Sequence, residues 1–437
     1  MRRFLLALPL ACAAALSGCE LDAVSPPIGP VGRSLAAQET AAQDAGSEVQ
    51  TAADAQAPTP ANPTQAQAAA QSLVVHEWGT FTSMQTSAGV TLEGMHHEDE
   101  ALPGFVHARD IKPKNQKGIE ILPEAVTQKM ETPVLYFHTA VARKIKVRVD
   151  FPQGVISQWY PDVTAFAPAK NTLTKLAGGS VTWDVQLDPK LDPALSPVVA
   201  PDDIWAPSRK VAATMLSYGK QVERFLFYRG LGRFELPVRV TSDVAGMVTV
   251  RNDGKEDLPA AFLLLTTASG GRVVALGPIA AGQSVKAQVP EALPGIAALV
   301  QSAGQALHSA LVATGLFADE ARSMVDTWSK SYFQTPGLRV LYVLPAAWTD
   351  ALLPLQVTPA PTATVRVLVG RIEVLTPAIE QQIVAAVQAS LDKGNAQPVT
   401  DLGRFLEPKL LRAAQLVTTP KLQAHCKDLL QWAASQP

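Results

Sequence analysis

The sequence predicts a mainly β fold followed by an α+β C-terminal part. Two observations predict it: apolar and polar residues alternate with a period of two over most of the body, and helical spacing begins after Pro290. The chain has 437 residues, of which 47% are hydrophobic and 17% charged. This composition provides sizeable hydrophobic cores, and the length corresponds to two or three domains.

Predicted strands occupy most of residues 73–290. Residues 145–151 alternate apolar side chains with charged ones, which is typical of a half-solvated strand. The same alternation returns at residues 181–187, after the turn at Gly178-Gly179. Further strands are expected at 225–228, 236–241, 246–251, 261–267 and 272–276.

The C-terminal third, residues 291–437, is predicted to be α+β. Helical spacing covers residues 296–318 and 318–331, and strand patterns return at 338–344 and 365–375. Thr376 is an expected helix N-cap because a proline follows it at the first helical position, and Thr419 repeats this signal. Cys426 falls in the amphipathic segment 422–432, which indicates a small buried core residue and not a reactive thiol.

Within the body, the stretch VTVRNDGKEDLPAAFLLL…LGPIAAGQSVKAQV has an NDG turn and a late AGQS loop. In these features it resembles bacterial immunoglobulin-like β-sandwich domains. The resemblance implies that residues 241–290 are sandwich strands that continue the β-rich domain of residues 73–240. It implies no activity, because such sandwiches carry many unrelated functions.

The chain begins with Arg2 and Arg3, an apolar run from Phe4 to Leu16, and the sequence Leu-Ser-Gly-Cys that ends at Cys19. The apolar run is too short to span a bilayer. The segment resembles the lipobox of bacterial lipoproteins. This implies that residues 1–18 are a cleaved signal peptide and that Cys19 is the lipid attachment site. An ordinary signal peptide with an incidental cysteine is the alternative.

The lipobox resemblance also implies a location. The mature protein would be anchored in the lipid bilayer of a bacterial cell envelope, facing the periplasm or the cell surface. The outer membrane is favoured over the inner one.

Residues 19–72 are rich in Ala, Pro, Gln and Thr, and they contain no aromatic residue. Such a segment buries too little apolar surface to offset its ordering entropy, so we expect a disordered tether. It carries six acidic residues against Arg33, which leaves residues 73–437 nearly neutral. We therefore expect no nucleic-acid partner and membrane attachment through the lipid alone, while a protein or carbohydrate ligand stays unidentified.

Five of the seven histidines lie within about 60 residues of each other, among several acidic residues. Imidazoles and carboxylates together suit zinc, iron or manganese, so this segment is the candidate site for a divalent metal. His97 and His107 are the expected pair because the loop between them contains Pro103 and Gly104. If residues 74–82 form a strand, His76 and Glu77 point to opposite faces and cannot share an ion. The candidate ligands are His76, His96, His97, His107 and His138, to the exclusion of His308 and His425.

Other chemical signatures are absent or weak. The sequence HEWGT at residues 76–80 is not the HExxH metalloprotease motif, and there is no GxSxG, Walker A or GxGxxG sequence. The run HHEDE at residues 96–100 offers carboxylates for calcium but lacks the EF-hand frame. The aromatic residues Trp159, Tyr160 and Trp183 suit a sugar platform or a core, and their place on strands favours the core.

A second resemblance rests on the phrases VVHEWGTFTSMQ, DEALPGFVH, METPVLYFH, GVISQWYPDV, ERFLFYRGLGRFELPV and LRVLYVLP. Together they resemble a family of secreted proteins from large-genome soil and aquatic bacteria, such as myxobacteria and planctomycetes. The match spans roughly residues 73–420, so it implies that the body is one integrated unit. It transfers no catalytic residue.

Two functional hypotheses follow. The favoured one is a membrane-anchored envelope lipoprotein with a binding or structural role. The alternative is a metal-dependent hydrolase that uses the histidine-rich segment 76–138. Convergence of at least three of the five histidines or nearby acids around one cleft would favour the enzyme, whereas scattered histidines would favour the binding protein.

Overall fold

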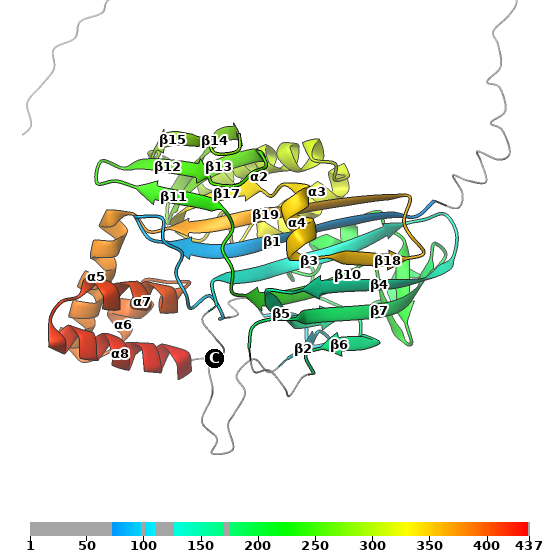
Figure 1. Ribbon diagram of the computed structural model, residues 1–437, viewed down its shortest axis with the longest axis horizontal. Helices are drawn as coiled ribbons and strands as arrows, with labels where there is room; N and C mark the ends of the chain where they lie inside the picture. The colour runs from blue at the N-terminus through cyan, green and yellow to red at the C-terminus, as the bar shows by residue number, and fades with distance from the viewer. Residues whose placement is uncertain (1–71, 98–100, 110–125, 170–174, 436–437) are drawn as a thin grey trace, which may run out of the picture. The chain divides into compact units, whose positions relative to one another are not determined.

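The computed structural model describes residues 72–97, 101–109, 126–169 and 175–435 (Figure 1). These residues belong to one compact unit. The predicted signal peptide, Cys19 and almost all of the predicted tether lie outside the described residues. The described part is mostly β, with helices concentrated toward the C-terminus, which confirms the predicted fold class at this level.

A ten-stranded mixed sheet forms the centre of the body, in the order β16-β14-β13-β17-β19-β1-β3-β10-β5-β2. Its central strand β1 (Val74–Gln85) pairs in parallel with β19 (Ala363–Val374) and antiparallel with β3 (Gln128–His138). Residues 73–240, 241–290 and 291–437, the three predicted segments of the body, all contribute strands to this one sheet. The other strands are β2 (His107–Ala108), β5 (Gly154–Tyr160), β10 (Leu226–Gly232), β13 (Leu258–Thr267), β14 (Gly270–Ile279), β16 (Leu293–Pro294) and β17 (Gly337–Val343).

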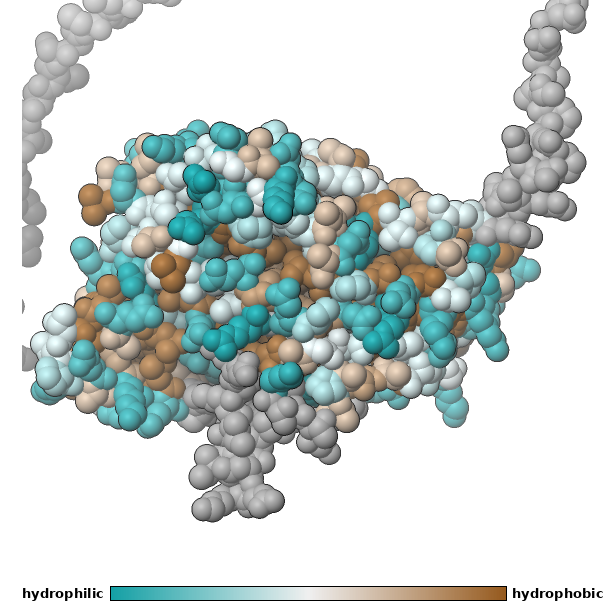
Figure 2. Space-filling view, viewed as in Figure 1, coloured by the Kyte–Doolittle hydropathy of each residue, from teal (hydrophilic) through white to brown (hydrophobic). Residues whose placement is uncertain are grey.

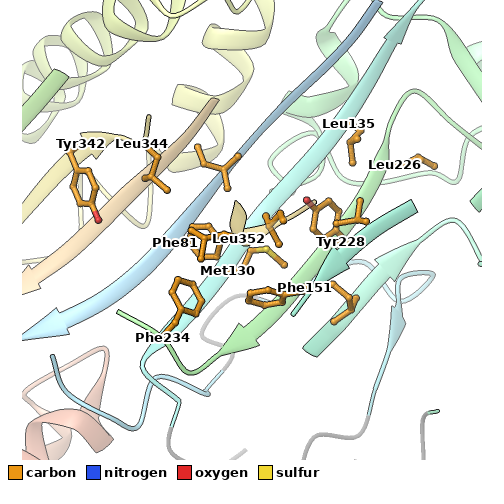
Figure 3. Packing of buried hydrophobic residues seen from close by; sticks show 14 of the residues in the cluster. Phe81, Met130, Leu135, Phe151, Leu226, Tyr228, Phe234, Tyr342, Leu344 and Leu352 are labelled. Atoms are coloured by element: carbon orange, nitrogen blue, oxygen red, sulfur yellow. The ribbon is translucent and has the colours of Figure 1, made fainter. Parts of the chain in front are cut away.

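Two smaller sheets pack against one face of the ten-stranded sheet through a shared apolar core. Figure 3 shows part of this core, where Phe81 and Met130 of the large sheet approach Phe151 of a smaller one. The three-stranded sheet is β11 (Val238–Ser242), β12 (Met247–Asn252) and β15 (Ser284–Gln288). The other sheet contains β18 (Leu355–Thr358), β4 (Arg143–Phe151), β7 (Gly179–Asp188), β8 (Met215–Tyr218) and β9 (Gln221–Glu223), with β6 (Ala165–Ala167) paired to β7.

Strand β4 shows why the period-two pattern predicted a strand. Its apolar residues, from Ile145 to Phe151, are all buried, whereas Lys144, Lys146 and Arg148 between them are exposed. Successive side chains of a strand point to opposite faces, so the alternation buries one face and solvates the other. The predicted core position of Trp159, Tyr160 and Trp183 is also confirmed, since all three are buried.

Helices α2 (Ile296–Ala313) and α3 (Ala318–Trp328) cover the opposite face of the ten-stranded sheet. Helix α2 buries a stripe that includes Leu299, Ala303, Leu307 and Leu311, the four-residue spacing of one helix face. Among the described residues, α2 is the one helix that is long and apolar enough to cross a membrane. A core helix of a soluble protein meets the same criterion, so this observation is weak evidence for a span.

The chain ends in helices that form a third apolar cluster with the end of β1 and its following loop. The predicted N-cap is confirmed, because Thr376 Oγ1 accepts a hydrogen bond of 3.2 Å from the Ile379 amide. Cys426 is buried as predicted, and its burial raises the pKa of the thiol. The helices of this cluster are α5 (Pro377–Lys393), α6 (Gln397–Thr400), α7 (Leu406–Leu416) and α8 (Pro420–Ser435).

In the described part of the chain, three shorter helical elements lie in the connections between strands. They are η1 (Pro193–Leu195), η2 (Pro207–Lys210) and α4 (Ala346–Leu352). Figure 2 shows that hydrophilic side chains cover much of the displayed face, with apolar side chains between them.

Candidate functional site

Three polar side chains meet where the ten-stranded sheet faces the start of α3. His76 lies in β1, His138 ends β3, and Glu320 is at the third position of α3. In the antiparallel pair, His76 lies opposite Tyr136 and His138 opposite Val74, so the two histidines are diagonal neighbours on one face. We call His76, His138 and Glu320 the histidine triad.

The two oxygens of the Glu320 carboxylate each face one imidazole. Oε2 lies 2.6 Å from His76 Nδ1, and Oε1 lies 2.9 Å from His138 Nε2. The ring of Phe317 packs on both imidazoles, with centroid separations of 4.4 Å to His76 and 5.0 Å to His138. The Phe317 amide also donates to Glu320 Oε2, which fixes this carboxylate at the start of α3.

Burial separates the triad from an ordinary surface ion pair. Glu320 is fully buried and His76 nearly so, while the side chain of His138 is 19% exposed. Burial raises the pKa of the Glu320 carboxyl, but hydrogen bonds from His138, His76 and the Phe317 amide outweigh this and lower it. Glu320 is therefore a carboxylate at neutral pH and can bind a proton donor or a cation.

A second group contains His96, His97 and Glu407. The two histidine rings stack at 4.4 Å, and both Nε2 atoms approach the same carboxylate oxygen of Glu407, at 3.3 and 2.9 Å. In the described part of the chain, these two groups are the clusters whose donor atoms lie close enough together to hold one ion. His308 and His425 belong to neither group.

The expected pair of His97 and His107 does not form in the described structure. His97 belongs with Glu407, whereas His107 is in the edge strand β2, where it stacks on Trp159 and approaches Gln221. Strand pairing of β2 with β5 holds His107 at the edge of the ten-stranded sheet.

The expectation that His76 and Glu77 cannot share an ion is confirmed. Glu77 points to the other face of β1, where it accepts hydrogen bonds from Arg366 Nε and Tyr228 Oη. Glu131, another acid of the histidine-rich segment, binds Thr82 and Tyr332 and not a histidine. The remaining nearby acids, Glu98, Asp99 and Glu100, lie outside the described residues.

At the opposite end of the same sheet face lies a buried ion network that the sequence analysis missed. Its centre is Glu373 of β19, whose Oε1 accepts from Arg339 Nε at 2.8 Å and from Arg371 Nε at 2.7 Å. Both arginines are completely buried. The two guanidinium groups lower the pKa of Glu373 to about 2, although burial alone would raise it. We call Arg339, Arg371, Glu373, Glu131 and Arg404 the arginine network.

Glu131 is the second carboxylate of the arginine network. Its Oε2 accepts from Thr82 Oγ1 at 2.6 Å and from Tyr332 Oη at 2.8 Å, and its Oε1 lies 3.6 Å from Arg404 Nη2. Burial raises its pKa, but Lys129, Arg404 and Arg371 lower it well below the ordinary value. Both carboxylates of the network are therefore ionised.

Two adjoining cavities open beside the arginine network. One, of about 170 Å³, is lined by Arg339, Arg371, Arg404, Phe405 and Lys409 among others. The other, of about 620 Å³, is lined by Asp202, Asp326 and Lys330, and it shares Thr335 and Arg404 with the first. Neither cavity is lined by a residue of the histidine triad.

One sequence signal pointed to this network. Arg366, Arg371 and Glu373 interrupt a largely apolar strand, and charged residues in a buried strand require partners. Glu320, by contrast, carried no signal, because it lies 244 residues from His76 in an ordinary helix start.

Comparison with known proteins adds no function. No protein-family model and no curated protein matches the sequence, so the resemblance to a secreted bacterial family stays a prediction. The Fcho1 mu homology domain of Danio rerio with bound Eps15 peptide is 8% identical, at a TM-score of 0.28, over 70% of this chain and 99% of that one. The yeast delta-COP-I mu-homology domain complexed with the Dsl1 WxWxV peptide is 8% identical in sequence, at a TM-score of 0.28. The match covers 70% of this chain and 98% of that one. Similarities this low establish neither a shared fold nor a shared function.

Proposed function

We propose that this protein is a lipid-anchored binding protein of a bacterial cell envelope whose body holds a divalent transition metal ion at the histidine triad. The observation that carries the proposal is the convergence of His76, His138 and Glu320 from three separate elements. Two imidazoles and one carboxylate are a donor set that zinc accepts, and it also suits iron or manganese.

The ligand atoms of the triad all lie within 4.8 Å of one another, close enough to hold one ion. Donor atoms about 2 Å from a tetrahedral zinc ion are roughly 3.3 Å apart, slightly wider than the present 2.6 and 2.9 Å contacts. The partly exposed ring of His138 and the half-exposed ring of Phe317 offer a route from solvent. Since strands and a helix hold the ligands, their positions are more rigid than those of ligands on loops.

The histidine triad is favoured over His96, His97 and Glu407 for the same reason. His96 and His97 are neighbours in a turn, and both converge on a single carboxylate oxygen. Loop ligands hold an ion less precisely than ligands fixed on paired strands.

The test is metal analysis of the purified protein. We expect stoichiometric zinc, iron or manganese in the wild type and its loss in the His76→Ala, His138→Ala double variant. The matched controls are the His96→Ala, His97→Ala double variant and the His308→Ala single variant, and both should keep the metal. The proposal would be overturned if the His76→Ala, His138→Ala variant kept the metal, if the His96→Ala, His97→Ala variant lost it, or if the wild type contained none.

Binding is favoured over the hydrolase alternative. Among the described residues, each group that could hold a metal contains two of the five histidines and a glutamate from a distant part of the sequence. The enzyme hypothesis required at least three of the five histidines or their neighbouring acids around one cleft. No triad residue lines either of the two cavities beside the arginine network, whereas a hydrolase needs its metal beside a substrate cleft.

The lipid anchor rests on the lipobox resemblance at residues 16–19. Two or three acyl chains hold a protein stably because each buried methylene contributes about 0.8 kcal/mol. We expect Cys19→Ser to move the protein from the membrane fraction to the soluble envelope fraction, with Cys426→Ser as the control that stays with the membrane. Membrane retention of Cys19→Ser at the wild-type level would refute the anchor.

We further propose that residues 241–290 are a divergent immunoglobulin-like sandwich. The division of its strands between two sheets supports this: β12 pairs with β15 in the small sheet, whereas β13 pairs with β14 in the large one. Their buried residues meet in one core. Binding through such a scaffold fits the proposed role better than any single chemistry does.

A further inference from the structure

We propose that the 170 Å³ cavity beside the arginine network binds a small oxyanion, the carboxylate or phosphate group of a small molecule. This site is independent of the histidine triad, and it belongs to the opposite end of the sheet face. Three observations carry it: the charge of the lining, the state of Arg371 and the conformation of Phe405.

The lining is rich in positive charge. Among the described residues, four cations line the cavity, Arg339, Arg371, Arg404 and Lys409, against two carboxylates, Glu373 and Asp401. A third carboxylate, Glu131, does not line the cavity but lies 3.6 Å from Arg404 Nη2. Asp401 is exposed and accepts a hydrogen bond from Gln397. A small enclosed space bordered by several cations is an environment that favours an anion.

Arg371 has more hydrogen-bond donors than the surrounding residues provide acceptors for. It shares Glu373 Oε1 with Arg339, so one carboxylate lies between two fully buried guanidinium groups. Arg339 satisfies its remaining nitrogens with the carbonyl oxygens of Tyr332 and Thr335. Nη1 of Arg371 is buried without a hydrogen-bond partner. An oxyanion would supply the acceptor that this guanidinium lacks, since a buried donor without one is costly.

Phe405, another residue of the cavity lining, has a strained backbone conformation. Phe405 has a φ of 59°, which is costly for a side chain with a β-carbon, yet its ring packs 5.4 Å from the Arg371 guanidinium and 5.0 Å from that of Arg404. Thr132, the other non-glycine residue with positive φ among the described residues, directly follows Glu131 of the same network. Strain of this kind persists where the surroundings hold it, and it concentrates at ligand sites.

The adjoining 620 Å³ cavity indicates how such a ligand would lie. It shares Arg404 and Thr335 with the smaller cavity, and its lining includes Asp202, Asp203 and Asp326. The anionic group would therefore enter the smaller, cationic cavity, and an uncharged or cationic remainder would occupy the larger one. This arrangement favours a small molecule with one anionic end over a free polyanion.

The experiment measures the shift in melting temperature of the purified full chain with inorganic phosphate, acetate and succinate, each against sodium chloride at equal ionic strength. A ligand that binds the folded state raises the melting temperature with its concentration. We expect phosphate or a carboxylate to produce a saturable shift beyond that of chloride, and the active series identifies the anion. No shift beyond chloride with any of the three would overturn the proposal.

Two variants locate the site. Arg404→Gln changes a half-buried residue shared by both cavities, and Arg371→Lys keeps a charge while removing the guanidinium fork. In both variants, the anion concentration that gives half of the maximal shift in melting temperature should rise at least tenfold. Arg412→Gln is the matched control, because it lies on α7 yet lines neither cavity and pairs with Glu380. Because the readout is the shift and not the melting temperature itself, a variant with lowered stability still reports binding. An unchanged shift in both site variants, or its loss in Arg412→Gln, would overturn the assignment.

Discussion

The two ends of one sheet face differ in the kind of base that meets the buried carboxylates. At one end, Glu320 faces two imidazoles, and at the other, Glu373 faces two guanidinium groups. Both carboxylates are buried, and the apolar middle of the face separates them. The same strands, β1 and β3, contribute residues to both ends: His76 and His138 to the first, Thr82 and Glu131 to the second.

The difference lies in what each base does with its proton. An imidazole exists neutral or protonated near neutral pH, so it can donate a hydrogen bond, accept one or bind a metal ion. A guanidinium keeps its charge, so its surroundings must always supply negative charge or an acceptor. The histidine end therefore suits a cation, and the arginine end suits an anion.

The largest effect should come from Glu373→Gln. This change leaves two fully buried arginines without their carboxylate, and breaking a buried pair costs about 3–5 kcal/mol. We expect the free energy of unfolding, measured with urea, to fall by that amount. Asp184→Asn is the control, because its pair with Lys146 is exposed at 3.7 Å and should contribute less than about 1 kcal/mol. A Glu373→Gln effect no larger than that of the control would refute the network's role.

Acid should remove the same interaction gradually. Burial raises the pKa of Glu373, but Arg339 and Arg371 lower it more, to about 2 from the ordinary 4.5. A carboxyl whose pKa is lower in the folded state stabilises above its unfolded pKa and loses that contribution as pH falls. We expect a loss on the order of 3 kcal/mol between pH 4.5 and 2. Urea unfolding across this range should show the gap between wild type and Glu373→Gln closing; a constant gap would contradict the prediction.

Glu320→Gln should have a smaller effect, because imidazoles can change tautomer and accept from the new amide. The remaining loss is that of hydrogen bonds to a charged group, about 1–3 kcal/mol. Urea unfolding of metal-free protein at neutral pH measures it. A cost equal to that of Glu373→Gln would remove the distinction between the two ends.

The smallest effect is expected for Phe317→Ala. The ring packs on both imidazoles but is 48% exposed, so its loss should lower the free energy of unfolding by less than about 1 kcal/mol. If the ring shields a metal at the triad, the variant should release zinc to a chelator faster than wild type does. Unchanged release would exclude the shielding role.

Local pattern accounts for the parts of the fold that were predicted. The alternation in β4, the spacing in α2 and the cap at Thr376 each involve residues within about a turn or a strand of one another. Such signals survive in the sequence because the period of the structure is also the period of the side chains. The separation of His76 from Glu77 followed from the same rule.

The sequence by itself determined part of the fold: strands such as β4, helices such as α2, and the cap at Thr376. It also determined the core aromatics and the histidine-rich segment from which the candidate ligands come. Only the tertiary structure decided that β1 pairs in parallel with β19, 289 residues later, and that Glu320 joins His76 and His138. It also decided that Arg339, Arg371 and Glu373 share one buried space. The physical reason is that contacts between distant segments depend on which faces pack together, and the spacing of neighbouring residues carries no record of that choice.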